Sequence, residues 1–346
     1  MYTQENLLFL SYESPQYSRT GVYFSGLSGE NLRFIQVPPG VFKSASAIRA
    51  LRQDPSLENY KIVVMSPSHL LAVISKMLLP NTIILDAGWS LSESSLTNFS
   101  GLKSILRLPK NLFIDFLSFH LANQLILESP EQLAYVSKRF LVKKEKISHI
   151  YTGFNESEYS HKANRIINSD SQEFSVLFRG KFNQEAGFEM LAEVTRILKD
   201  KPIKFHIQTN VQIQQYKFSE KTTSSSQFLN PMEIENLYLS ADLCLGQLSS
   251  KRRLRRTIPH KAFESLYFGK CYLSPNTVPL NTLFHNENLA ILLDDVNPDL
   301  IAQTIEVLSK NKKFAQKLGV DAQKYYRQHL SQDNLAKKFI EVCSKL

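Results

Sequence analysis

The sequence contains little cysteine and no long apolar run. Its 346 residues include three cysteines, Cys244, Cys271 and Cys343, which are widely spaced and odd in number. This pattern argues against a disulfide framework and a zinc site, and favours buried thiols in a reducing cytosol. No stretch approaches the roughly 18 apolar residues of a membrane span. The N-terminus also lacks the basic start and the long apolar core of a secretory signal. We therefore expect a cytoplasmic protein.

The remaining composition is that of a folded protein. Hydrophobic residues make up 43% and charged residues 21%, and 22 Phe and 14 Tyr supply far more buriable surface than disordered chains carry. A domain usually takes about 100 to 200 residues, so this length suggests two domains. The net charge of +9 suits a nucleic acid, an anionic membrane surface or a phosphorylated substrate, and composition does not choose among them.

Short apolar runs alternate with helical patterns along most of the chain. In the first half we predict strands over 6–12, 33–37, 60–65, 82–85, 124–127 and 146–151, and helices over 69–79, 113–121 and 130–140. These strands lack polar alternation and are separated by helices, so we expect them to be parallel and buried on both faces. Residues 1–155 are therefore predicted to form one doubly wound α/β domain.

A polar, serine-rich segment at 156–172 interrupts this pattern and is the predicted linker. The pattern then restarts, with strands over 174–178, 203–208, 242–245, 271–273 and 290–293, and helices over 187–198, 232–239, 258–268, 299–308 and 312–346. The second predicted domain, 173–325, thus repeats the architecture of the first, and 326–346 follows it as a C-terminal helix. Two such domains form a cleft between the carboxyl ends of their sheets, where this kind of fold binds ligands.

The segment richest in candidate functional residues is 251–270, KRRLRRTIPHKAFESLYFGK. It opens a predicted helix, with Thr257 as the expected cap and Pro259 in the first turn. A helix start presents backbone N–H groups and the positive end of the helix dipole, which suit a phosphate. Lys261 and Glu264 are three residues apart on one face, so the lysine suits phosphate oxygens and the carboxylate suits ribose hydroxyls. The alternative for this spacing is an exposed helical ion pair.

Two further features accompany this helix. Five of the six residues at 251–256 are basic, which favours a phosphate-binding field; a solvated basic loop, a nucleic-acid patch or a targeting signal are the alternatives. After the predicted strand 174–178, Arg179-Gly180-Lys181 places a glycine where the backbone can approach a ligand closely. A short strand-to-helix turn explains this second feature about as well.

Several segments of the C-terminal half match one family in order. They are VLFRGK (176–181), EAG (185–187), LYLSADLCL (237–245), IPHKAFESLYFGKCYL (258–273) and NENLAILL (286–293). They resemble, in turn, the strand and Gly-Arg turn, the Glu-Lys-Gly, the Ala-Asp strand, the donor-binding helix and the Gly-x-Asn-Gly-x-Leu segment of retaining GT-B glycosyltransferases, in particular the glycogen-synthase-like "glycosyltransferase group 1". In the N-terminal half only 120–143 resembles the family.

The resemblance implies an α/β fold of two doubly wound Rossmann-like domains facing across a cleft, with the C-terminal helix crossing back to the first domain. It implies transfer of a sugar, with retention, from a nucleotide-sugar in the C-terminal half to a hydroxyl acceptor, which we expect to be a glycan or a lipid-linked sugar. No metal or other cofactor is implied. The donor-binding residues would be Gly180, Lys181, Arg256, Ile258, Pro259, Lys261 and Glu264, and the catalytic candidates are Asp86, Lys181 and Lys261.

The acceptor-side candidates lie in the N-terminal half, after predicted strands: Arg19, His69, Asp86 and Gly88. A carboxylate at the end of a strand can orient an acceptor hydroxyl, which is the functional interpretation of Asp86. The alternative for Asp86 is a helix or turn cap. A lone histidine such as His69 is more often packed or capped than catalytic.

The sequence departs from the family at three positions. The family's paired glutamates lie eight residues apart; Glu264 fits the second, but Arg256 stands at the first, as in a divergent subgroup. Lys181 replaces the arginine of a phosphate-binding pair and loses its bidentate fork. Ala186 stands at the second cation of that pair, so Lys261 or the arginines at 252–256 must supply the charge. These departures leave open a catalytically weakened protein that binds a nucleotide-sugar or a glycan.

A third hypothesis, from another class, is a basic protein that binds nucleic acid or a membrane surface. The basic segment 251–256 lacks interleaved aromatic residues, so we expect no nucleic acid as a partner. The helix expected over 323–346 is amphipathic and carries several lysines. In the family such a helix latches the two domains; peripheral docking at the inner membrane face is the alternative.

Overall fold

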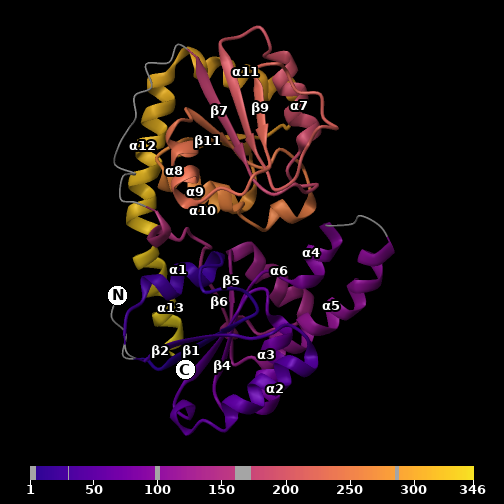
Figure 1. The fold of residues 1–346 in the computed structure, drawn as a ribbon, viewed down its shortest axis with the longest axis vertical. Coiled ribbons are helices and arrows are strands. Elements are labelled where there is room, and N and C mark those ends of the chain that lie inside the picture. Colours follow the sequence, from indigo (N-terminus) through magenta and orange to yellow (C-terminus); the bar gives the residue numbers. More distant parts are fainter. Residues whose placement is uncertain (1–4, 30, 98–101, 160–172, 285–287) are drawn as a thin grey trace. The chain divides into compact units, whose positions relative to one another are not determined.

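The computed structural model describes residues 5–29, 31–97, 102–159, 173–284 and 288–346. The chain divides into two compact units, Met1–Glu156 with Leu330–Leu346, and Ser157–His329. Each unit contains a parallel six-stranded sheet flanked by helices (Figure 1). This confirms the prediction of two doubly wound α/β domains. Among the described residues, no helix is long and apolar enough to cross a membrane.

The first sheet has the strand order β2-β1-β3-β4-β5-β6 with parallel neighbours throughout. Its strands are β1 (Leu7–Ser11), β2 (Leu32–Gln36), β3 (Lys61–Met65), β4 (Ile83–Gly88), β5 (Gln124–Leu127) and β6 (Ile147–His149). Its helices are α1 (Ser18–Gly26), α2 (Val41–Arg52), α3 (His69–Leu78), α4 (Leu91–Thr97), α5 (Leu102–Leu121) and α6 (Pro130–Phe140). The central strands β1, β3 and β4 are almost entirely buried, as their apolar runs predict.

The last helix of the chain belongs to this first unit. α13 (Gln332–Cys343) packs against α1, and the rings of Tyr23 and Phe339 stack with their centroids 4.6 Å apart. At Gly26 the two helices approach so closely that a Cβ atom would lie 2.9 Å from the Cβ of Ala336. The buried face of α13 therefore packs against the N-terminal unit.

The second sheet has the strand order β12-β11-β10-β7-β8-β9, again with parallel neighbours. Its strands are β7 (Phe174–Arg179), β8 (Ile203–Gln208), β9 (Thr222–Ser225), β10 (Leu243–Leu245), β11 (Cys271–Pro275) and β12 (Ile291–Leu293). Its helices are α7 (Phe188–Ile197), α8 (Pro231–Leu239), α9 (His260–Tyr267), α10 (Val278–Phe284), α11 (Pro298–Lys310) and α12 (Lys312–His329). Asn230 caps α8 in a capping box with Glu233, and Asn297 caps α11.

Short or polar elements differ most from the predictions. The edge strand β9 has the sequence TTSS and is largely exposed, so it carries no apolar run to predict it. The short helices α4 and α10 and the helix α2 are likewise not predicted. Helix α5 begins at Leu102 rather than at residue 113, and it contains Pro109. The predicted helix 312–346 is two helices, because the chain turns at Leu330 and Ser331, whose Oγ accepts from the N–H of Asn334 to cap α13.

Candidate functional site

The carboxylate of Glu264 is the best-anchored charge in the second unit. It lies on α9 and is only 4% exposed. One oxygen accepts from Arg179 Nη1 at the end of β7 and from His260 Nδ1 at 3.1 Å, and the other accepts from the Tyr238 hydroxyl on α8. Burial by itself raises the pKa of Glu264, but Arg179 and the hydrogen bonds from His260 and Tyr238 lower it overall. Glu264 is therefore an ionised carboxylate with a fixed orientation.

Lys261 lies one turn earlier on α9 and is also buried, at 6% exposed. Its ammonium lies 3.6 Å from the centroid of the Phe178 ring and 3.4 Å from Oε1 of Gln247, the second residue after Leu245 ends β10. Burial lowers the pKa of Lys261 to about 7, although Glu264 opposes this shift. The expected alternative of an exposed helical ion pair is therefore wrong, since both side chains are buried.

The turn after β7 faces this ammonium. A Cβ atom at Gly180 would lie only 3.0 Å from Lys261 Nζ. The absence of a side chain at Gly180 therefore makes room for the lysine. The N–H of Gly180 donates to the carbonyl of Gln208 at 2.9 Å and so continues the sheet. Lys181, the next residue, is exposed. The structure thus brings Gly180 and Lys261 together and leaves Lys181 at the surface.

The basic segment before α9 is an ordered turn. Arg252–Arg255 form a 3₁₀ helix, in which Arg253 donates to Glu185 at 2.8 Å. Thr257 does not cap α9 as the sequence suggested: its hydroxyl donates to the carbonyl of Arg253, and Pro259 occupies the N-cap position. A cap at Thr257 would start the helix at residue 258, whereas α9 starts two residues later, at His260, with no side-chain cap.

The remaining donor-side candidates surround this turn. Ile258 is buried, whereas Pro259 and Arg256 are partly exposed. Ala186 is fully buried in the hydrophobic core of the unit, so this position, where the resemblance had implied a cation, carries no charge. Gly187 follows it with φ +75°, and a Cβ atom there would lie 2.4 Å from the carbonyl oxygen of Leu248. Only glycine fits this backbone.

In the first unit, Arg19 and Asp86 form a buried two-point ion pair. Arg19 Nε donates to one oxygen of Asp86 at 2.8 Å and Nη2 to the other at 2.9 Å. The guanidinium also donates to the carbonyl of Ile150 and to the hydroxyl of Tyr23. Gly88, with φ +64°, borders this pair, since a Cβ atom there would lie 3.5 Å from Arg19 Cδ. Both oxygens of Asp86 are thus occupied, and the pair links α1, β4 and the segment after β6.

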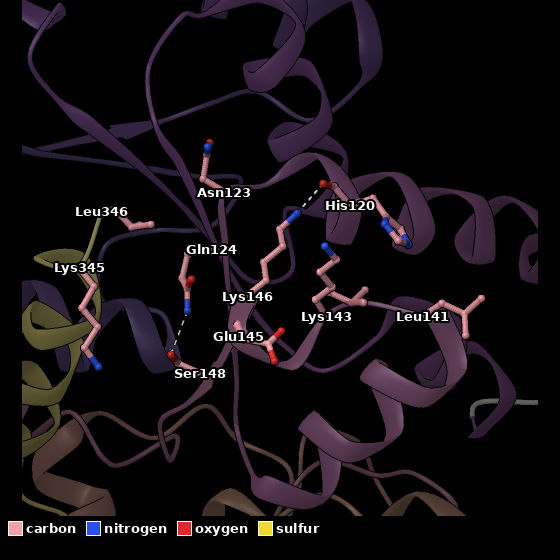
Figure 2. A pocket seen from close by; sticks show the side chains of 11 residues that line it. His120, Asn123, Gln124, Leu141, Lys143, Glu145, Lys146, Ser148, Lys345 and Leu346 are labelled. Carbon is pink, nitrogen blue, oxygen red and sulfur yellow. Dashed lines mark hydrogen bonds between the residues drawn. The ribbon is translucent and has the colours of Figure 1, made fainter.

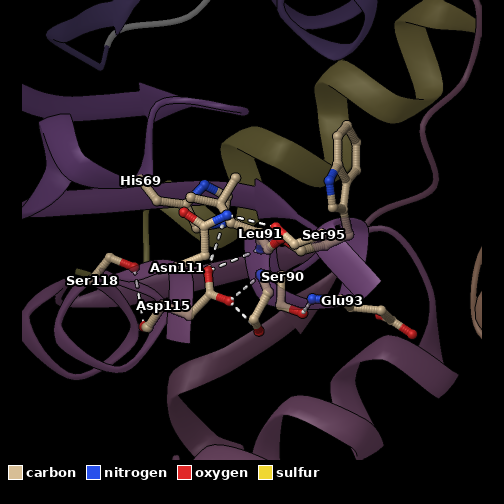
Figure 3. Close-up of polar contacts among 10 residues, drawn as sticks. His69, Ser90, Leu91, Glu93, Ser95, Asn111, Asp115 and Ser118 are labelled. Atoms are coloured by element: carbon tan, nitrogen blue, oxygen red, sulfur yellow. Dashed lines mark hydrogen bonds and ion pairs between the residues drawn. The ribbon is translucent and has the colours of Figure 1, made fainter. Parts of the chain in front are cut away.

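His69 and Asp115 form a second buried cluster in the first unit (Figure 3). The Nε2 of His69 is 3.0 Å from the carbonyl of Trp89, so we assign the hydrogen to Nε2. Asp115, whose Oδ1 lies 3.9 Å from His69, accepts from the N–H groups of Leu91 and Ser92. Burial lowers the pKa of His69 even though Asp115 opposes this, which favours neutral imidazole. The cluster therefore orders the start of α4.

Sequence reasoning missed several residues of these clusters. His260 lies four residues before Glu264 on the same helix, and this spacing was the available signal for it. Ser90 and Glu93 carry the S-x-x-E pattern of a helix start, and Ser90 Oγ accepts from the N–H of Glu93 as that pattern predicts. The turn at 179–181 was identified, but the contact of Arg179 with Glu264 was not. Tyr238 and Asp115 come from distant segments, so local spacing carried no signal for them.

The second unit therefore combines three features at one edge of its sheet: a fixed carboxylate, a buried ammonium and a helix start. Arg179, Gly180 and Gln247 all follow the carboxyl ends of parallel strands, where folds of this type bind ligands. Such a constellation suits a ligand that has both an anionic group and hydroxyl donors. Among the described residues, no three His, Cys, Asp or Glu side chains gather as a metal site would require.

No family model matches the sequence, and no curated protein matches it. Solved structures do match its fold. Sucrose-phosphate synthase from Thermosynechococcus elongatus has a TM-score of 0.75 at 14% identity, covering 99% of each chain. Anabaena HepE in complex with UDP-glucose has a TM-score of 0.71 at 12% identity, covering 98% of this chain and 99% of that one.

An α,α-trehalose-phosphate synthase (UDP-forming) from Burkholderia vietnamiensis has a TM-score of 0.66 at 9% identity, covering 99% of each chain. Because these identities are low, the likeness establishes the fold: this chain has the two-domain α/β architecture known as GT-B.

Proposed function

We propose that the chain is a glycosyltransferase of a divergent branch of glycosyltransferase group 1, which transfers a sugar with retention from a nucleotide-sugar to a hydroxyl acceptor. The observation that carries the proposal is the Lys261 ammonium. It is buried, and among the described residues its one hydrogen bond is the contact of 3.4 Å to Gln247. A buried cation is normally paired with an anion, and the diphosphate of a donor supplies one.

In the proposed complex the diphosphate lies at the start of α9. Lys261 donates to it, Ile258 and Pro259 set the position of the helix start, and Gly180 leaves room beside the ammonium. Transfer of the sugar leaves negative charge on the departing phosphate, and cations that are already in place stabilise that charge. Lys181 and Arg256 add to this positive field.

We propose that Arg253 supplies the positive charge that is missing at Ala186. Glu185, the residue before Ala186, holds the Arg253 guanidinium at 2.8 Å. On the other side of the site, Glu264 accepts three hydrogen bonds, whereas a carboxylate has about four acceptor positions. The remaining position is proposed for a ribose hydroxyl of the donor.

The acceptor side is proposed to be ordered by the first unit. Asp86 has both oxygens on Arg19 and no exposed surface, so we propose that it acts by holding Arg19 and the Gly88 turn in place. His69 is proposed to act similarly, through the turn at Trp89. The proposed acceptor is a glycan or a lipid-linked sugar, which suits the positive net charge. The proposed enzyme works in the cytoplasm without a metal or other cofactor.

Donor turnover tests the proposal. The protein is incubated with UDP-, GDP- and ADP-sugars, and slow release of the nucleoside diphosphate is measured without an acceptor. UDP-sugars come first, because HepE was solved with UDP-glucose and the trehalose-phosphate synthase is described as UDP-forming. We expect the wild type to release the nucleoside diphosphate from one donor, and we expect Lys261→Met and Glu264→Ala to lose this activity. Absence of binding to every donor would refute the proposal.

A second candidate function is binding of a nucleotide-sugar without transfer. It is favoured by one observation: Ala186 is a core residue, so the second phosphate-binding cation of the family is missing from its usual place. Donor binding without release of nucleoside diphosphate, in the presence of candidate acceptors, would support it. Nucleic-acid binding through 251–256 has less support, because no aromatic residue is interleaved with the basic ones.

A further inference from the structure

A pocket of about 680 Å³ lies in the first unit, away from the residues discussed above (Figure 2). It is lined by His120, Asn123, Gln124, Leu141, Val142, Lys143, Glu145, Lys146, Ser148, Lys345 and Leu346. Gln124 begins β5 and Lys146 directly precedes β6, so the pocket is at the amino ends of these strands. Asp86 and Gly88 lie at the carboxyl end of the neighbouring β4. The pocket is therefore at the opposite edge of the sheet from the proposed acceptor residues.

The pocket has an excess of positive charge. Three lysines line it, Lys143, Lys146 and Lys345, whereas Glu145 is the one acidic side chain among the lining residues that the structure describes. A fourth lysine, Lys76, donates to the lining residue Asn123 at 3.0 Å. Burial lowers the pKa of Lys146, and the charge of Lys76 lowers it further. An anion in the pocket would relieve this repulsion.

Exposed apolar side chains border the same pocket. Leu141, which lines it, is 81% exposed. The ring of Phe116 lies against the ring of His120, another lining residue, with centroids 4.4 Å apart and the ring planes tilted by 43°. Phe113 is 63% exposed one turn earlier on α5 and so continues the same helix face.

This face of α5 also carries a basic residue. Lys110 is exposed one turn before Phe113, and Leu106, two turns before Phe113, adds a further exposed apolar side chain. We call the pocket lysines together with Lys110, Phe113, Phe116 and Leu141 the basic-apolar surface. Large apolar side chains rarely gather at a surface without a partner. A partner for this surface must accept apolar side chains and carry negative charge at the same time.

We propose that the basic-apolar surface binds the interface of an anionic phospholipid bilayer. A headgroup phosphate would occupy the lysine-lined pocket, while Phe113, Phe116 and Leu141 would enter the boundary between headgroups and acyl chains. A nucleic acid would match the lysines, and its bases would stack on the two phenylalanines, but it offers no apolar medium for the exposed Leu141. The proposal does not depend on glycosyl transfer, since it concerns the opposite edge of the sheet.

The C-terminal helix, for which membrane docking was the alternative to a latch, does not offer such a surface. Its Lys337 and Lys338 are exposed. The apolar residues of that helix are instead buried: Leu335, Ala336 and Phe339 have no exposed surface. Lysines without an exposed apolar face do not anchor a helix in an interface. Helix α13 therefore serves as the comparison for α5.

Vesicle flotation of the full chain tests the proposal. Vesicles of phosphatidylcholine alone are compared with vesicles that also contain phosphatidylglycerol, at low and high salt. We expect binding to the anionic vesicles only, weakened by salt. The variant K110Q/K143Q should bind about 30-fold more weakly, which corresponds to about 1 kcal/mol for each basic side chain. The variant F113S/L141S should bind anionic vesicles at least tenfold more weakly than the wild type.

Two matched controls keep the result specific. K337Q/K338Q removes two exposed lysines from α13, and F42S removes an exposed phenylalanine from α2; both should bind vesicles as the wild type does. Circular dichroism and thermal melting confirm that each variant folds. Equal binding to neutral and anionic vesicles would overturn the proposal, as would loss of binding in K337Q/K338Q but not in K110Q/K143Q. Binding of soluble glycerol phosphate without vesicle binding would also overturn it.

Discussion

Replacement of Lys261 by methionine separates stability from ligand binding. Methionine keeps the length of the side chain and its contact with Phe178, and it removes the buried charge. A pKa of about 7, against 10.5 for an exposed lysine, means that the folded protein, mainly through burial, disfavours the ammonium by about 5 kcal/mol. We expect the variant to be more stable than the wild type at pH 6, by about 3 kcal/mol once packing losses are included.

The pH dependence follows from the direction of this shift. Below pH 7 the lysine is charged in both the folded and the unfolded wild type, so the full cost of the buried charge is present. Between pH 7 and 10.5 the unfolded chain holds the extra proton, so the stability of the wild type rises with pH. The advantage of Lys261→Met should therefore shrink across this range and vanish above it. Urea denaturation at several pH values measures it, with the exposed Lys199→Met as control.

Binding should change in the opposite direction. An ammonium hydrogen-bonded to phosphate contributes about 1.5–3 kcal/mol, so Lys261→Met should bind UDP about 10- to 150-fold more weakly. A bound diphosphate raises the pKa of Lys261, so the wild type should take up close to one proton per UDP at pH 8. Calorimetry in buffers of different ionisation enthalpy detects that proton. Equal UDP affinity in both proteins, with no proton uptake, would refute the reasoning.

Three other predictions concern the buried contacts. Glu264→Gln should lower the free energy of unfolding by about 1.5–3 kcal/mol in chemical denaturation, because it removes the charge that pairs with the partly buried guanidinium of Arg179. Gly187→Ala should cost at least about 2 kcal/mol by thermal melting, since its Cβ would lie 2.4 Å from the Leu248 carbonyl oxygen at a φ of +75°. Asp86→Asn should destabilise by about 3–5 kcal/mol, and Arg19→Met/Asp86→Leu by less, because the double variant leaves no unpaired charge. If Arg19→Met/Asp86→Leu had a lower free energy of unfolding than Asp86→Asn, the interpretation of Arg19 and Asp86 as a buried pair would be wrong.

The fold was largely predictable because its central strands are apolar on both faces. Short, largely apolar runs such as 82–85 and 124–127 are typical of strands buried in a parallel sheet, and both lie in strands of the structure. Strand β9 was not predictable, because an edge strand needs no apolar residues. Helix α5 was predicted only from residue 113 onward because its first half mixes apolar and basic residues with Pro109.

The site was predictable only where its residues are close in sequence. Lys261 and Glu264 share a helix face, so their spacing indicated a joint role, but not that both are buried. The buried carboxylate of Glu264 is held by Arg179 and Tyr238, which lie on a strand and a helix elsewhere in the chain. Asp86 shows the same limit. Its place at a strand end was predictable, whereas its pairing with Arg19, 67 residues away, was not.

The most direct test of the account is a crystal structure of the protein with a nucleoside diphosphate bound. The account predicts phosphate oxygens within hydrogen-bond distance of Lys261 Nζ, beside Gly180 and at the start of α9, with a ribose hydroxyl on Glu264. A diphosphate bound elsewhere, with Lys261 still directed at Gln247, would contradict it.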